Sequence, residues 1–182
     1  MSFPRAGFLL FWCVLGLQSA AGPARSQSAP VTRGQLIGAW RLVELEYSGP
    51  NGSRIDPFYQ KDSTGILIYD ASGWMSVHIV GPNRRAWEIP ASRLSAPAVA
   101  AETVLKEAAF DSYYAYFGTW ELDPRTSVVT HRVSSALIPG ETGLSYFQSV
   151  ALEDGRLVLT TRVRQDGAVT VRRKIWVRED PV

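Results

Sequence analysis

From residue 35 onward, hydrophobic and polar residues alternate with a period of two over short segments. Such alternation is typical of β-strands with one buried face. Clusters of Gly, Pro, Asn and Asp separate the segments, and Asp154-Gly155 and Asp166-Gly167 are strong hairpin signals. The pattern therefore predicts eight strands joined by short turns. They span residues 39–47, 65–69, 74–80, 114–122, 127–137, 145–152, 156–164 and 169–178.

One longer segment has a helical period instead. Small and aliphatic residues recur at helical spacing on one side, while Glu102 and Lys106 form an i,i+4 pair on the other. Ser95 can cap this segment at its start. We predict an amphipathic helix at residues 97–111 that covers one end or flank of the sheet. A brief helical turn is expected within residues 31–37. The small and aliphatic positions of the longer helix are Ala98, Ala101, Leu105 and Ala108.

Eight antiparallel strands in sequence predict an all-β fold, an eight-stranded up-and-down barrel with the helix between its third and fourth strands. Strands of about nine residues favour closure, and closure removes exposed strand edges. The interior of such a barrel holds side chains or one small ligand. A two-layer sandwich is the alternative topology. Residues 29–182 are expected to form this single domain.

The first 28 residues have a different character. Arg5 precedes an apolar run at residues 6–17, and small residues follow it, as in a secretory signal peptide and linker. Cleavage is expected between Ala21 and Ala29. An uncleaved membrane anchor is the alternative, but 12 apolar residues fall short of the roughly 20 that a span needs. We therefore predict a secreted or periplasmic protein without a stable membrane span.

Removal of this leader changes both cysteine content and charge. Cys13 is the sequence's single cysteine and lies in the leader, so the mature domain is expected to form no disulfide. The formal net charge of +2 includes Arg5 and Arg25, and loss of both would balance the charge. The run Arg172-Arg173-Lys174 lies in a predicted strand, where side chains alternate between faces instead of forming one patch. Nucleic-acid binding is therefore not expected.

The combination of several segments resembles a known family. The segments are Leu36-Ile37-Gly38-Ala39-Trp40-Arg41-Leu42-Val43, Pro57-Phe58, Gly65-Ile66-Leu67-Ile68-Tyr69, Gly73-Trp74-Met75-Ser76-Val77, residues 115–123, residues 128–133 and residues 157–161. Together they are similar to the lipocalin-like domain family of small calycin-type barrels, over nearly all of residues 35–178. This resemblance implies the barrel fold without a known reaction. It also implies that an arginine near the end of the last strand, Arg178 or Arg173, stacks on Trp40.

Two loops depart from the pattern of that family. The chain has Gly81-Pro82-Asn83-Arg84 after the third strand and Pro139-Gly140-Glu141-Thr142 after the fifth. Both loops are placed where they would border a pocket mouth. The resemblance therefore does not extend to the type of ligand.

Strand alternation also assigns candidate residues to the barrel interior. Val129, His131 and Val133 share the more apolar face of their strand, whereas His78 is expected to face outward with Ser76. We predict an apolar, aromatic-lined pocket that binds or carries a small hydrophobic or aromatic molecule, with His131 orienting the ligand's polar end. A hydrogen-bonded core role is the simpler interpretation of His131. The predicted pocket residues are Trp40, Leu42, Met75, Tyr116, Trp120, His131 and Phe147.

Two other functions remain open at this point. A barrel isomerase or cyclase would use His131 with Glu44 or Glu121 as acid and base, which requires an inward carboxylate. A packed barrel without a cavity would serve in an envelope complex. The spacings His-x-His, His-Glu-x-x-His and Gly-x-Ser-x-Gly do not occur, so we expect no metal, no cofactor and no acyl-transfer serine.

Overall fold

The computed structural model describes residues 30–49, 52–53, 62–84, 86, 96–165 and 167–180. The predicted signal peptide and linker at residues 1–28 lie outside the described residues. The elements in chain order are α1 (Arg33–Leu36), β1 (Gly38–Gly49), β2 (Gly52–Ser53), β3 (Thr64–Tyr69), β4 (Trp74–Val80), α2 (Ala96–Asp111), β5 (Tyr113–Asp123), β6 (Val128–Ala136), η1 (Pro139–Glu141), β7 (Ser145–Glu153), β8 (Arg156–Gln165) and β9 (Ala168–Arg178).

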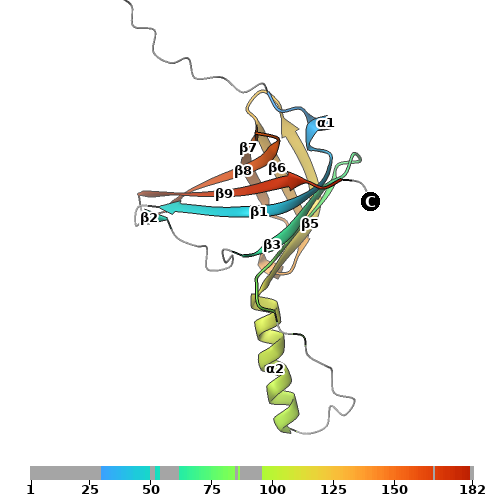
Figure 1. Cartoon of the computed structure of the whole chain (residues 1–182), viewed down its shortest axis with the longest axis vertical. Helices are drawn as coiled ribbons and strands as arrows, with labels where there is room; N and C mark the ends of the chain where they lie inside the picture. Colours follow the sequence, from blue (N-terminus) through green and yellow to red (C-terminus); the bar gives the residue numbers. More distant parts are fainter. Residues whose placement is uncertain are drawn as a thin grey trace, which may run out of the picture.

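The strands close into an antiparallel barrel (Figure 1). Each strand from β3 to β8 pairs with the next in sequence, and β1 pairs with both β3 and β9. The barrel within the described residues thus has eight strands, and β2 is a short addition to the end of β1. The pairing of β1 with β9 confirms the predicted barrel over the sandwich.

The element boundaries follow the sequence pattern closely. The strand predicted at residues 74–80 is β4 without change, and the helix predicted at residues 97–111 is α2 with one more residue. The hairpin turn at Asp154 and Gly155 has positive φ at both residues, as a two-residue hairpin requires. The pattern predicted neither β2 nor the single turn η1, because segments of two or three residues carry no periodicity.

One end of the barrel is closed by α1. Thr32 caps this helix in a reciprocal arrangement, in which its side chain accepts from the Gln35 N–H and its own N–H donates to Gln35 Oε1 at 2.8 Å. The helix holds Leu36 fully buried in the barrel end. The Trp40 indole N–H then donates to the Leu36 carbonyl at 2.8 Å. This contact ties the closing helix to the first strand.

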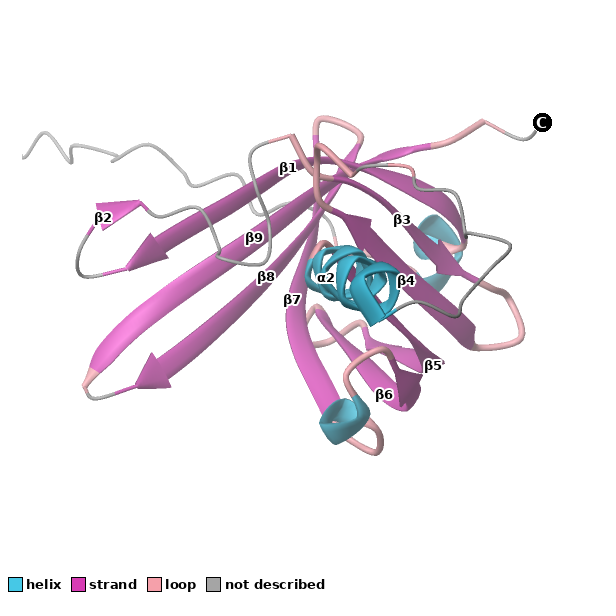
Figure 2. Ribbon diagram, turned by 90° about the horizontal axis from the view of Figure 1, so that it is seen from below, coloured by secondary structure: helices cyan, strands magenta, loops and turns pink. Residues whose placement is uncertain are grey.

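The position of α2 differs from the prediction of a helix that covers one end or flank of the barrel. It extends away from the end opposite α1 and packs against β5 near its own root (Figure 1). Seen from below, α2 stands between β1, β8 and β9 on one side and β4 to β6 on the other (Figure 2). The Glu102–Lys106 pair forms as predicted, at 2.8 Å. However, Val104 is 64% exposed and Phe110 is also exposed, so the helix has apolar residues on more than its packed side.

Within the described residues, no helix combines the length and the apolar character that a transmembrane helix needs.

Candidate functional site: the inner face of the barrel

Six of the seven predicted pocket residues lie on the inner face of the barrel. Each is at most 4% exposed, and the five hydrophobic ones belong to a single core cluster. The alternation of β1, β4, β5 and β6 was therefore interpreted correctly for these positions. The six are Trp40, Leu42, Met75, Tyr116, Trp120 and His131.

Phe147 is a correction to the predicted pocket. Its side chain is 65% exposed on the outer face of β7. Tyr146 and Gln148 lie on either side of it in sequence, and they pair with the inward-facing His131 and Val129. Apolar residues occur on both faces of β7, so hydrophobicity alone pointed to the wrong side. Gln148, which the sequence analysis missed, is the inward residue.

Glu44 is a second correction, and a β-bulge is its cause. The pairing of β1 with β9 shifts between Leu42 and Glu44, so that Val43 is an extra residue on β1. An inserted residue reverses the facing of everything after it. Glu44 is consequently exposed on the outer face, and Leu45 packs against the core in its place.

Glu121 also lies outside the barrel. It is exposed on β5 and forms an ion pair with Arg132 at 2.5 Å, where both side chains are more than half exposed. Neither carboxylate considered as an acid–base partner therefore meets His131. The geometry that a His–Glu isomerase or cyclase requires is not assembled by these residues.

His131 is instead the centre of a buried hydrogen-bond cluster. Its Nε2 lies 2.6 Å from the Tyr69 hydroxyl, and its Nδ1 lies 2.9 Å from the Tyr116 hydroxyl and 3.2 Å from the Gln148 amide nitrogen. An amide N–H can only donate, so in this arrangement Nδ1 accepts and Nε2–H donates to Tyr69. The ring of His131 also packs edge-on against that of Tyr69.

Burial decides the protonation of this cluster. His131 is fully buried, and desolvation lowers its pKa to about 3, with a further contribution from the positive charge of Lys174. Burial raises the pKa of Tyr69 well above its usual range. Both groups are therefore neutral at physiological pH. The cluster can thus form hydrogen bonds in the core without introducing a buried charge of its own.

In the described part of the chain, two buried polar groups on the inner face have no hydrogen-bond partner. They are Gln148 Oε1 and the indole N–H of Trp176, and both residues are almost completely buried. Buried polar groups in folded proteins are nearly always paired, with protein, water or ligand. Together they offer a free acceptor and a free donor on a wall that is mainly aromatic and aliphatic and also carries the His131 cluster. Sequence alternation in β7 and β9 was the available signal for both residues.

The closed end carries two tryptophan–arginine contacts. The Arg178 guanidinium lies 4.2 Å from the centroid of the Trp40 ring and donates to the Ile37 carbonyl at 2.7 Å. Arg33 lies 4.3 Å from the Trp120 centroid and donates to the Ala71 carbonyl at 2.9 Å. These cation–π contacts cover the tryptophans from outside. Of the two arginines that the resemblance suggested for Trp40, Arg178 is the one that stacks.

His78 faces outward with Ser76, as predicted. Its Nε2 lies 2.6 Å from the Ser76 hydroxyl and its Nδ1 lies 2.8 Å from the Tyr113 hydroxyl. A groove of about 200 Å³ adjoins it on β5 and β6. His78 and His131 therefore lie on opposite faces of the sheet. Within the residues that the structure describes, no three metal-ligating side chains are close enough together to hold an ion.

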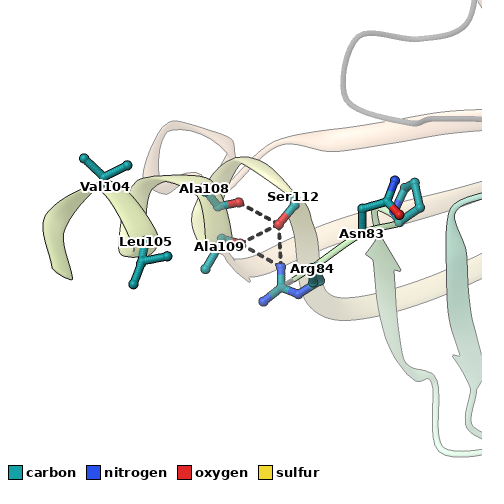
Figure 3. Close-up of a pocket in the computed structure, with 8 residues that line it drawn as sticks. Asn83, Arg84, Val104, Leu105, Ala108, Ala109 and Ser112 are labelled. Atoms are coloured by element: carbon teal, nitrogen blue, oxygen red, sulfur yellow. Dashed lines mark hydrogen bonds between the residues drawn. The ribbon is translucent and has the colours of Figure 1, made fainter. Parts of the chain in front are cut away.

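A second cavity, of about 300 Å³, lies at the root of α2 (Figure 3). Arg84 reaches across it and donates to the Ala109 carbonyl and the Ser112 hydroxyl, each at 2.8 Å. Val104 and Leu105 form its apolar side. Because Arg84 is bonded to the last turn of α2, this cavity belongs to the attachment of the helix and not to the barrel interior.

Comparison with known proteins adds the family relationship. The model of a family described as a lipocalin-like domain matches residues 37–178. A search of curated proteins found no match to the chain.

Proposed function

The chain belongs to the lipocalin-like domain family, and we propose that its barrel binds or carries a small hydrophobic or aromatic molecule. The ligand's apolar body would contact the aromatic inner wall formed by residues such as Trp40, Tyr116 and Trp120. Its polar end would be oriented by the cluster around His131. Removal of apolar ligand surface from water would contribute about 25 cal/mol per Å².

The unpartnered groups on the inner face are the observation that carries this proposal. Among the residues that the structure describes, Gln148 Oε1 and the Trp176 indole N–H are buried on the inner face without a hydrogen-bond partner. A ligand site typically combines an apolar wall with a few placed polar groups. A bound molecule with a donor and an acceptor would satisfy groups whose burial otherwise costs stability.

We do not extend the proposal to isomerase or cyclase chemistry. His131 is neutral and hydrogen-bonded to phenols and an amide, and both candidate carboxylates lie on the outer face. A general base near neutral pH requires a pKa near the working pH. The lowered pKa of His131 makes it a poor base and a suitable hydrogen-bonding anchor.

We further propose that the protein is exported and works in the periplasm or outside the cell. The support is the sequence of residues 1–28, with Arg5, an apolar run and small residues before Ala29. Edman sequencing of the mature chain, recovered from a host's exported fraction, tests this proposal. A mature N-terminus between residues 22 and 30 is expected. An uncleaved, cell-associated chain would contradict the export proposal.

Native mass spectrometry of the exported protein tests the binding proposal. We expect either a co-purifying small molecule, released by organic solvent, or a mass shift with members of an apolar ligand panel. Gln148→Met should reduce binding because it removes the free acceptor while keeping side-chain volume. Phe147→Ser is the matched control, since this outer residue should not affect binding. An apo mass with no shift across the panel would reject the carrier and support a packed barrel that acts in an envelope complex.

A further inference from the structure

The outer face of β4 carries a serine and a histidine in direct contact. Ser76 and His78 are two residues apart on one strand, so their side chains lie on the same face of the sheet. The Ser76 hydroxyl is 2.6 Å from His78 Nε2, and both side chains are half-buried. A hydroxyl in hydrogen-bond contact with an imidazole is the starting arrangement for a serine nucleophile. A Gly-x-Ser-x-Gly motif presents its serine on a turn, whereas here the strand itself brings the two side chains together.

Tyr113, at the start of β5, contacts the other nitrogen of this imidazole. Its hydroxyl is 2.8 Å from His78 Nδ1, and the two rings meet edge-on with centroids 6.0 Å apart. With the ring proton on Nδ1, that N–H donates to the phenol oxygen and leaves Nε2 to accept the Ser76 proton. The Arg84 guanidinium carbon lies 5.4 Å from the Tyr113 centroid, a cation–π contact that helps to hold the phenol in place. The order of the contacts is thus hydroxyl, imidazole and orienting group.

The groove of about 200 Å³ on the outer face adjoins this pair. Both His78 and Phe117 line it, and Phe117 lies directly opposite Ser76 in the pairing of β4 with β5. Ile68 is opposite Ser76 on the other side, on β3, and the side chains of Phe117 and Ile68 are exposed. The serine hydroxyl therefore lies between two exposed apolar side chains, beside a groove that fits an apolar group.

The sheet limits how strongly this site can stabilise an oxyanion. Ser76 has a paired strand on each side, so the backbone N–H groups around it bond within the sheet. An oxyanion hole of free backbone donors, each worth about 10²–10³ in rate, is therefore not formed by this described stretch of β4. An ester with a good leaving group depends least on such donors. The site thus suits an activated ester better than an amide.

We propose that Ser76 is a nucleophile that hydrolyses aryl esters of short apolar acids, with His78 as its general base and Tyr113 as a positioning residue. The apolar acyl chain lies in the outer groove against Phe117. This activity goes beyond the proposed binding function and uses the opposite face of the sheet. It does not depend on a ligand in the barrel interior.

The reaction has two steps through an acyl-serine. Ser76 Oγ attacks the ester carbonyl carbon while its proton passes to His78 Nε2, and the phenol then leaves with that proton. Water next attacks the acyl-serine while His78 takes its proton. The carboxylic acid leaves as His78 returns the proton to Ser76 Oγ, which restores the starting state.

Labelling with a fluorophosphonate tests the nucleophile directly. An activated serine displaces fluoride and forms a stable bond from Oγ to phosphorus, so the modified residue can be located by peptide mass spectrometry of the whole protein. We expect the adduct on Ser76. Ser149 is the internal control, because it is an exposed serine on β7 whose cross-strand neighbours are Val128 and Thr160. An unlabelled protein, or labelling of Ser149 as fast as Ser76, would overturn the proposal.

Hydrolysis of p-nitrophenyl butyrate by matched variants tests the roles of the three residues. Ser76→Ala should lose the turnover above buffer, and Ser149→Ala should keep it. His78→Gln should lower kcat by about 10²-fold or more, the usual contribution of a general base, with little change in KM. Tyr113→Phe keeps the ring and loses one hydrogen bond to the imidazole, so we expect kcat to fall about fivefold at an unchanged KM.

Each result has one meaning for the proposal. Turnover that persists in Ser76→Ala, wild-type kcat in His78→Gln, or equal loss in Ser149→Ala would overturn it. If Ser76→Ala fails to fold, the labelled position in the unsubstituted protein still decides the identity of the nucleophile. Native mass spectrometry of Ser76→Ala with the apolar ligand panel keeps the two functions apart, because loss of esterase activity should leave binding in the barrel unchanged.

Discussion

Arg178 occupies the space that a side chain at Gly38 would fill. A Cβ at position 38 would lie 2.5 Å from Arg178 Nη1, and Gly38 has a φ of 132°, which other residues rarely adopt. The missing side chain lets the guanidinium lie over the Trp40 ring. The glycine, the tryptophan and the arginine therefore form one unit that connects β1 and β9 at the closed end of the barrel.

Replacement of Gly38 by alanine should displace Arg178 from its contact with the Trp40 ring. We expect Gly38→Ala to lower the free energy of unfolding by about 1–3 kcal/mol, because it adds both backbone strain and displacement of Arg178. Chemical denaturation measures the change. Gly34→Ala is the control, since nothing lies within 4 Å of a Cβ there and alanine is favoured in α1. Equal effects of the two substitutions would contradict the role assigned to Gly38.

Gly118 has an even stricter requirement for the absence of a side chain. A Cβ at this position would lie 1.9 Å from the Arg132 carbonyl oxygen and 2.8 Å from the Ser134 backbone nitrogen, beside the bulge between β5 and β6. Backbone atoms cannot rotate away as a flexible side chain can. We expect Gly118→Ala to destabilise the protein by more than about 3 kcal/mol or to prevent folding.

Gly140→Ala provides the comparison for Gly118, because nothing lies within 4 Å of a Cβ in η1. Thermal melts and soluble yield of both variants measure the difference. A Gly118→Ala protein as stable as Gly140→Ala would show that the two strands are not as close as the structure has them.

The buried His131 predicts a stability that depends on pH. Its pKa is about 3 in the folded protein, against an ordinary value of 6.5, so the unfolded chain binds the extra proton between these values. Stability should therefore be fully retained above about pH 6.5 and fall as the pH decreases from there toward 3. The expected slope from this residue is about 1.4 kcal/mol per pH unit at most. Urea denaturation at successive pH values measures it.

The contribution of His131 can be isolated with two variants. His131→Gln keeps a polar side chain but cannot titrate, so its stability should show a shallower decrease between pH 6.5 and 3. His78→Gln removes the other described histidine, which lies on the outer face, and controls for loss of a histidine as such. An unchanged slope in His131→Gln would contradict a neutral buried histidine.

Substitutions at Tyr116 and Phe147 test whether the inner or the outer face of the barrel contacts the ligand. Tyr116→Phe removes a hydroxyl that bonds His131 on the inner face, whereas Phe147→Ser changes an exposed outer residue. We expect the first to weaken ligand binding about five- to tenfold, because the anchor His131 loses the hydrogen bond from Tyr116, which is worth roughly 1 kcal/mol. The second should leave affinity unchanged. Fluorescence titration measures both, and the reverse order would restore the sequence-based assignment of Phe147.

Much of the fold is determined locally and could be predicted from the sequence. Strict alternation fixed the extents of strands such as β4 and the inward direction of Met75 and Tyr116, because a strand has a side-chain period of two. Asp154-Gly155 predicted its hairpin because both positions need positive φ. The helical period likewise predicted α2. These features depend only on residues near each other in the chain.

Tertiary structure decided the features that depend on distant residues. Glu44 turned outward because one extra residue in β1 changes its register with β9, and the local pattern does not reveal where a partner strand admits a bulge. Phe147 lies outside and Gln148 inside because β7 carries apolar residues on both faces, and only its pairing with β6 selects which face is buried. The site around His131 exists because closure of the barrel brings Tyr69, Tyr116 and Gln148 from three strands to one imidazole. The sequence by itself thus determined the strands and most of their faces, whereas the pairing of strands far apart in the chain determined which polar groups meet.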